Sequence, residues 1–449
     1  MRTRWMVPAG VMIAALLSAT GAGSVRAASR SEKTGPGSSD RVRVLRIYYR
    51  APVLVKAGEK VTMPVQVVCA TEAGRSCDAV VAIGVKSGTG DPWRFHRAEA
   101  GSNLMFDLTA PAARAASRDQ SVSFVIRATS GAVATSLPAG GAGPPIRFYV
   151  ASGIRTLKVP AIPFGHVRHG RTVLFLPWGS GPMRAGLELG RESPTVGPPS
   201  FDVDRAGGVQ LLDALQGRVA HFVHGRLARS WRSTAGPGAD LALTAGGGTY
   251  VADEVGGRVI TKHLSPSGKS LGSFSLGSGL LSQVRTVGEG AYAEVLPLDA
   301  WIQASGSVGS SYSLTPVTGR PLPSGERLLR VGTERYVRLG LVRGGRVHAA
   351  VELRGVQPFG EVALAEPDGS GGYVVVVRVW RSTPDPKDQY QVLHVSKGRV
   401  VETFATSSRS FAETPPLSRF RLGRDGRLYQ LVTSSAGIRI VRFELKEES

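Results

Sequence analysis

Hydrophobic and polar residues alternate over short stretches along most of this chain. Val61, Met63, Val65 and Val67, for example, are separated by polar or small residues. This two-residue period is that of a strand with one buried face. Similar short segments recur between turns rich in glycine and proline, whereas long helical patterns are scarce. The pattern therefore predicts an all-β protein.

Residues 41–150 are predicted to form a first domain. Its strand candidates lie at 42–47, 61–67, 80–85, 104–108, 122–127 and 146–150. Roughly six or seven short strands in this length are typical of an immunoglobulin-like β-sandwich. The tryptophan and cysteine spacing of antibody domains is absent, so the resemblance concerns the architecture. Residues 151–170 are expected to be a linker.

A sequence repeat begins after this linker. Two segments 40 residues apart align without gaps, and in each an Asp precedes an Arg by five positions. The pairs are Asp213 with Arg218 and Asp253 with Arg258. A glycine turn also recurs from Gly208 to Gly426, which is 218 residues in five steps of about 44. One four-stranded blade of a β-propeller has this length.

The repeat resembles the NHL-repeat propellers, in which a strand ending in Asp, a short turn and a strand starting with Gly/Asn-Arg recur in every blade. The likeness is clearest in residues 200–260. It implies a β-propeller over residues 171–449. The glycine turns predict six blades, with the early strand at 171–176 completing the last blade and removing its free edge. Seven blades, starting near Ile162, are the alternative.

The first forty residues are expected to lie outside the folded domains. Arg2 and Arg4 precede a short apolar run, and small residues favour cleavage after Ala27, so residues 1–27 are predicted to be a signal peptide. Residues 28–40 are small and polar, which is typical of a disordered leader. The protein is thus expected to be secreted or extracytoplasmic, at the cell surface or in the periplasm, with no transmembrane segment after signal cleavage.

Cysteine usage and charge refine this picture. Cys69 and Cys77 are the two cysteines of the chain, and an even number in an exported protein predicts a disulfide, here one that pins a hairpin. The formal charge is +21, or +18 once the three arginines of residues 1–27 are removed. This charge favours an acidic partner. The basic residues are scattered without a continuous run, which argues against specific nucleic-acid binding.

Sequence motifs for catalysis or metal binding each have a structural explanation. His221 and His224 are three positions apart, so on a strand they point to opposite faces. The stretch 268–272 matches the G-x-S-x-G pattern of serine hydrolases, but it follows a hairpin turn rather than leading into a helix. Asn103 is the single asparagine of the chain, whereas propeller lactonases hold calcium partly with asparagine. No catalytic residue, metal ligand or cofactor is predicted.

Six residues are candidates for ligand binding. They are Trp178, Arg184, Asp213, Arg218, Asp253 and Arg258. The first two lie in a long Gly/Pro-rich loop, which either binds a ligand or packs over one face with the tryptophan as its anchor. The two Asp–Arg pairs either face a ligand or serve the scaffold, with each Asp accepting turn N–H groups and pairing with its Arg.

The sequence favours a secreted or envelope-associated binding or interaction protein over an enzyme. A propeller face, or the groove between the domains, would hold a protein, a peptide or an anionic glycan. The alternative is a propeller hydrolase or lyase with a metal in the central channel, which requires several carboxylates or histidines to converge there. A purely architectural protein of an appendage or a spore coat is a third reading.

Overall fold

The computed structural model describes most of the chain beyond residue 40. The described ranges are 41–49, 52–88, 90–98, 103–117, 121–137, 145–190, 192–296, 300–304 and 316–446. The predicted signal peptide and leader lie outside these residues. The described chain is largely β-strand, as predicted; its helical elements include α1 (Thr109–Ser117) and the 3-10 turn η2 (Ala214–Gln216). None of the described helices has the length and hydrophobicity needed to cross a membrane.

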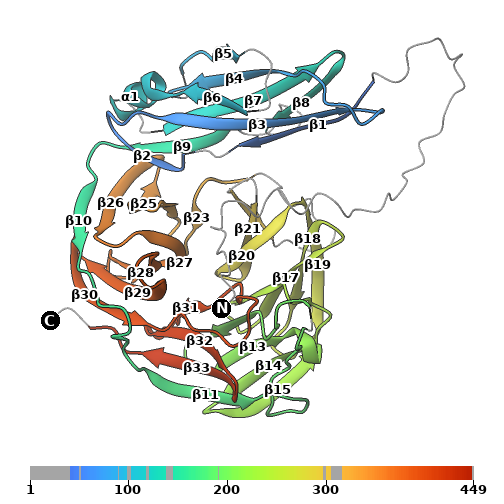
Figure 1. Ribbon diagram of the computed structural model, residues 1–449, viewed down its shortest axis with the longest axis vertical. Helices are drawn as coiled ribbons and strands as arrows, with labels where there is room; N and C mark the ends of the chain where they lie inside the picture. The colour runs from blue at the N-terminus through green and yellow to red at the C-terminus, as the bar shows by residue number, and fades with distance from the viewer. Residues whose placement is uncertain are drawn as a thin grey trace, which may run out of the picture.

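The strands of the N-terminal part form two sheets (Figure 1). One sheet contains β1 (Val42–Tyr49), β3 (Thr62–Thr71) and β6 (Asn103–Asp107). The other contains β2 (Leu54–Lys56), β9 (Ile146–Ala151), β7 (Ser121–Ser130), β4 (Val80–Lys86) and β5 (Arg94–Ala98), with β8 (Val133–Leu137) beside β7.

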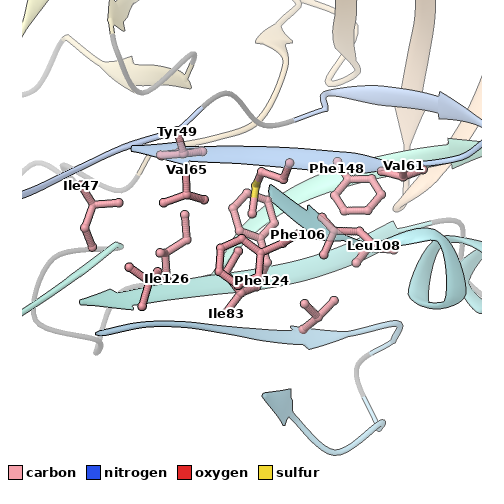
Figure 2. Close-up of a cluster of buried hydrophobic side chains, with 14 of the residues drawn as sticks. Ile47, Tyr49, Val61, Val65, Ile83, Phe106, Leu108, Phe124, Ile126 and Phe148 are labelled. Carbon is pink, nitrogen blue, oxygen red and sulfur yellow. The ribbon is translucent and has the colours of Figure 1, made fainter. Parts of the chain in front are cut away.

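One hydrophobic core lies between these two sheets (Figure 2). Val65 comes from β3, whereas Ile83, Phe124 and Ile126 come from the sheet opposite, and all four are at most 1% exposed. Along β3 the buried and exposed positions alternate as the sequence predicts. The alternation places every second side chain in the core, so that each sheet buries the apolar face of the other.

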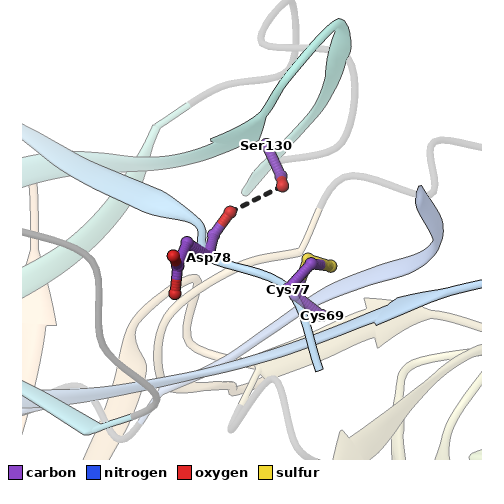
Figure 3. The surroundings of a disulfide bond; sticks show 4 residues. All are labelled: Cys69, Cys77, Asp78 and Ser130. Atoms are coloured by element: carbon purple, nitrogen blue, oxygen red, sulfur yellow. Dashed lines mark hydrogen bonds between the residues drawn. A yellow bond between two sulfur atoms is a disulfide. The ribbon is translucent and has the colours of Figure 1, made fainter. Parts of the chain in front are cut away.

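Cys69 on β3 and Cys77 form the predicted disulfide, with their Cα atoms 5.2 Å apart (Figure 3). The residues between them fold back on themselves in a tight turn. The carbonyl of Asp78 then accepts a hydrogen bond of 2.6 Å from the hydroxyl of Ser130 on β7. The disulfide therefore pins a hairpin at the point where the chain passes from one sheet to the other.

Replacing both cysteines with serine is expected to lower the free energy of unfolding by about 2 kcal/mol, because a short cross-linked loop restricts the unfolded chain only modestly. Denaturant unfolding of the variant and of the oxidised and reduced wild type measures this effect. The reduced wild type should match the variant. Unfolding of the variant at the same denaturant concentration as the oxidised protein would show that the bond adds no stability.

From residue 200 onward, the described strands form six sheets that follow one another along the chain, here named I to VI. Sheet I contains β12 (Ser200–Val203), β13 (Val209–Asp213), β14 (Arg218–Val223) and β15 (Arg226–Arg232); sheet II contains β16 (Asp240–Leu243), β17 (Thr249–Val255), β18 (Arg258–Leu264) and β19 (Ser270–Ser278); sheet III contains β20 (Leu280–Val287), β21 (Gly290–Leu296) and β22 (Ala300–Gln303).

The remaining three sheets complete the series. Sheet IV contains β23 (Arg320–Pro321), β24 (Arg327–Gly332), β25 (Val337–Arg343) and β26 (Arg346–Gly355); sheet V contains β27 (Phe359–Pro367), β28 (Tyr373–Arg381), β29 (Lys387–Ser396) and β30 (Arg399–Thr406); sheet VI contains β31 (Phe420–Leu422), β32 (Leu428–Ser434) and β33 (Gly437–Phe443). Each sheet contacts the next, and β31 contacts β12, so the series of contacts returns to its start (Figure 1).

Two earlier strands join these sheets. β11 (Arg171–Pro177) pairs antiparallel with β33, which confirms that the early strand adds to the last sheet. β10 (Arg155–Val159), within the stretch expected to be a linker, pairs parallel with β26. Both strands cover edges of sheets that would otherwise be open to other chains.

The N-terminal part packs against sheet IV. Leu54, Tyr149 and Ile154 form a buried apolar cluster with residues of sheet IV such as Leu329. At the same boundary the guanidinium of Arg338, which is 2% exposed, donates to the carbonyl of Leu54 at 3.1 Å. The same guanidinium lies 2.8 Å from the carboxylate of Glu59, so the two parts of the chain share both apolar and ionic contacts.

Candidate functional site

Four of the six predicted ligand-binding residues lie in one connected group. Trp178 donates through Nε1 to the carbonyl of Ser434 at 2.8 Å, and Arg184 donates to the carbonyl of Trp178 at 3.0 Å. Arg218 in turn donates to the carbonyl of Arg184 at 2.5 Å and lies 3.4 Å from the carboxylate of Asp213. These contacts fasten the loop after β11 to sheet VI and to the β13–β14 hairpin of sheet I.

Asp213 is a fully buried carboxyl at the centre of this group. It accepts the N–H of Gly186 at 3.2 Å. Burial raises the pKa of Asp213 above its ordinary value, although the Arg218 guanidinium and the Gly186 N–H act in the opposite direction. The residue thus joins the loop to the strand end, which is the scaffold arrangement described for such an Asp.

The second Asp–Arg pair does not meet, although its sequence spacing is identical. In sheet I the chain passes through η2 after Asp213, which leaves Asp213 directly opposite Arg218. In sheet II the strand β17 continues beyond Asp253, so that Arg258 pairs with Val255 instead. The Asp253 carboxylate accepts backbone N–H groups, and Arg258 is exposed.

A different pair, which sequence reasoning missed, recurs at the glycine turns. Asp204 and Asp368 each begin such a turn and lie 3.0 Å from a ring nitrogen on a neighbouring strand, His221 and His394 respectively. Each Asp also accepts the N–H of the last glycine in its turn at 2.8 Å. His221 is therefore part of a turn-stabilising pair rather than a partner of His224.

Ionisable side chains from five sheets meet at the inner strands. We name this group the inner arginine network; it consists of Asp240 on β16, Arg285 on β20, Arg320 on β23, Glu366 on β27 and Arg421 on β31. Asp240 lies 2.7 Å from Arg421 and 3.6 Å from Arg285. Glu366 accepts hydrogen bonds from Arg320, at 2.6 Å, and from Arg285, at 3.3 Å.

The electrostatics of this network follow from three guanidinium groups around two carboxylates. Burial raises the pKa values of Asp240 and Glu366, but the adjacent arginines outweigh it and hold both pKa values below their usual range. Burial, followed by repulsion from Arg421, lowers the pKa of Arg285 to about 10. Both carboxylates are thus ionised and paired with arginine. The alternative function, with a metal in the central channel, needs carboxylates that are available as ligands.

A second basic feature lies on the outside of sheet I, on its last strand, β15. We name it the arginine edge; it consists of Arg226, Arg229 and Arg232, all exposed. The Arg229 guanidinium lies 5.9 Å from the ring centroid of Trp231. In the described part of the chain none of the three is ion-paired with a carboxylate. Their spacing of three residues hides the group from a search for consecutive basic residues.

No protein-family profile and no curated protein matches this sequence. Several solved structures with propeller-like folds do match it. A streptogramin B lyase structure is 10% identical, with a TM-score of 0.32 over 57% of this chain and 96% of that chain. Virginiamycin B lyase from Staphylococcus aureus is 6% identical (TM-score 0.35; 56% and 96% covered). A quinonprotein alcohol dehydrogenase-like protein from Bacteroides thetaiotaomicron is 8% identical (TM-score 0.22; 80% and 94% covered).

Proposed function

We propose that this chain is a secreted or envelope-associated binding protein for an acidic partner, either a protein, a peptide or an anionic glycan. In this proposal residues 1–27 are a signal peptide, 41–150 an immunoglobulin-like β-sandwich, 151–170 a connection that adds β10 to sheet IV, and 171–449 a six-bladed propeller with NHL-like repeats. The closed series of contacts among sheets I to VI supports the six-bladed arrangement.

The arginine edge is the observation that carries the proposal. Its three side chains lie along one edge strand over about 20 Å, given a rise of about 3.3 Å per residue. A bulge places Arg226 and Arg229 on the same face of the strand, whereas Arg232 lies on the other face. Guanidinium groups bind carboxylate and sulfate groups through paired hydrogen bonds, and an edge strand that carries them on both faces offers several contacts to an extended anionic chain. Charged residues on an edge strand also discourage pairing with other copies of the protein, so binding has to be tested separately from solubility.

Replacing the three arginines of the edge with glutamine is expected to weaken retention on a dextran sulfate resin, because it removes three exposed charges that lie close together on one edge strand. The elution salt concentration should fall clearly, since these contacts are exposed and screened by salt. The matched control replaces three exposed arginines elsewhere, Arg335, Arg346 and Arg409, and so has the same net charge. Equal elution of the two triple variants would assign retention to overall charge and reject the edge as a site.

A further inference from the structure

The boundary between sheets III and IV differs from the other boundaries of the series. At the five other boundaries, including that between sheets VI and I, a cluster of buried apolar side chains joins the two sheets. Among the described residues, no such cluster joins sheet III to sheet IV. A pocket of about 200 Å³ lies there instead. Neighbouring blades normally bury each other's apolar faces, so a polar pocket at this position requires a different explanation.

The pocket has a charged side and an apolar side. Its charged wall includes Arg285, Arg320, Arg330 and Glu294, all from sheets III and IV. Its apolar wall includes Trp301, which is 5% exposed. Val53 of the N-terminal part also lines the pocket, together with Leu328, Val331 and Ala365. The docking of the N-terminal part on sheet IV therefore helps to enclose this space.

Arg330 is the pocket arginine with donors to spare. Arg330 reaches Glu294 at 3.4 Å and the carbonyl of Val362 at 3.4 Å, which is long for a charge-assisted hydrogen bond of about 2.8 Å. Glu294 is held more closely by Gln283, at 2.7 Å. Arg320 donates through both Nη groups to Glu366, and its Nε is buried without an acceptor. It therefore contributes positive charge to the pocket rather than a free donor.

The local charge balance leaves one positive charge uncompensated. The pocket arginines Arg285, Arg320 and Arg330 are three cations, and the carboxylates that they contact near the pocket, Glu294 and Glu366, are two anions. Asp240 and Arg421, the remaining members of the inner arginine network, cancel each other. The surplus corresponds to a single anionic group. Crowding of like charges is also visible in Arg285, whose pKa burial and Arg421 lower to about 10.

We propose that this pocket binds a small organic monocarboxylate with an apolar body about the size of benzoate. The carboxylate would accept hydrogen bonds from Arg330 and neutralise the surplus charge beside Arg320, while the apolar body would lie against Trp301. A protein cavity of about 150 Å³ accommodates benzene, so 200 Å³ suits a ring with one added carboxylate. A doubly charged phosphate would exceed the surplus and leave the apolar wall unused. This site is separate from the arginine edge and does not depend on it.

Saturation-transfer NMR on the full chain tests the proposal, with benzoate as the probe, benzamide as its neutral counterpart and inorganic phosphate as a purely polar anion. Benzoate should receive saturation from the protein, and benzamide should not. Arg330→Met should weaken the affinity for benzoate about tenfold, because it removes a charge that contacts the carboxylate. Arg346→Met, an exposed change on the same sheet, should leave the affinity unchanged. Thermal melting confirms that both variants fold.

Three results would overturn the proposal. These are the absence of saturation transfer to benzoate at millimolar concentration, equal binding of benzoate and benzamide, and equal affinity of the Arg330→Met and Arg346→Met variants for benzoate. Phosphate binding more tightly than benzoate would reject the apolar part of the ligand. The wild-type comparison of benzoate with benzamide keeps the test decisive even if Arg330→Met is unstable. Retention on dextran sulfate can fail or succeed independently of all these results.

Discussion

Asp240→Asn is expected to lower the free energy of unfolding by about 3 to 5 kcal/mol, because it leaves buried guanidinium groups without their counter-charge. Asp240 is fully buried. Its carboxylate accepts hydrogen bonds from Ser200 and Ser418, at 2.5 and 2.8 Å, and from Arg421, at 2.7 Å. An amide in its place cannot compensate Arg421 or accept at both oxygens, so one substitution disturbs the inner strands of several sheets.

Denaturant unfolding of the variant measures this loss, and Glu444→Gln provides the control. Glu444 is exposed and pairs with Arg427 and Arg442 at the surface. Breaking surface ion pairs of this kind changes the free energy of unfolding by about 1 kcal/mol or less. If Asp240→Asn costs no more than the control, the inner arginine network contributes little to the stability of the fold.

The same substitution should change the acid sensitivity of the protein. The pKa values of Asp240 and Glu366 lie below the ordinary values of 3.8 and 4.5 in the folded state. Their stabilising contribution is therefore fully present above those ordinary values and is lost as the pH falls through the folded pKa values. The free energy of unfolding of the wild type should drop below about pH 4, and the drop should be shallower for Asp240→Asn.

Arg338→Met should lower the free energy of unfolding by about 3 kcal/mol. It should also loosen the N-terminal part from sheet IV. The guanidinium lies 2.5 Å from the buried carboxylate of Glu352 and 2.8 Å from Glu59 of the N-terminal part. Burial raises the pKa of Glu352, but hydrogen bonds from Arg338 and Arg354 outweigh it and lower the pKa overall. Removing Arg338 takes away one of the two guanidinium groups that hold this buried carboxylate, and it breaks the ionic contact between the two parts while their apolar cluster remains.

Equilibrium unfolding together with limited proteolysis of the connection near residue 152 measures both effects. Arg354→Met is the matched control, because Arg354 contacts the same Glu352 at 2.7 Å but is largely exposed. The control should lower the free energy of unfolding by about 1 kcal/mol or less, and it should leave the proteolysis rate unchanged. Identical behaviour of the two variants would contradict the role of Arg338 in joining the two parts.

Much of the architecture was predictable because its signals are local. The alternation around Met63 and Val65 reports directly on which side chains face a core, since successive residues of a strand point to opposite faces. The recurring glycine turns show where each hairpin ends, and their spacing of about 44 residues gives the size of one sheet. The pairing of β11 with β33 followed from counting strands. The disulfide followed from an even cysteine count.

Local spacing did not determine which side chains meet. Asp213 and Asp253 each precede an arginine by five residues, yet hairpin register brings Asp213 to its Arg and keeps Asp253 from its own. A single extension of β17 produces this difference, and register depends on packing against the rest of the sheet. The sequence spacing predicts two equivalent pairs, and the tertiary structure shows that the first pair forms and the second does not.

By itself, the sequence determined the strand content, the repeat and the chain's positive charge, because each of these can be read from neighbouring residues or from the composition. The contacts between the sheets, including that between β31 and β12, determined which distant side chains meet. Arg285 and Arg421 lie far apart in the sequence, as single arginines in unremarkable strands, and they share Asp240 once sheets II, III and VI come together. Their contact depends on the packing of three sheets from distant parts of the chain, which no short stretch of sequence encodes.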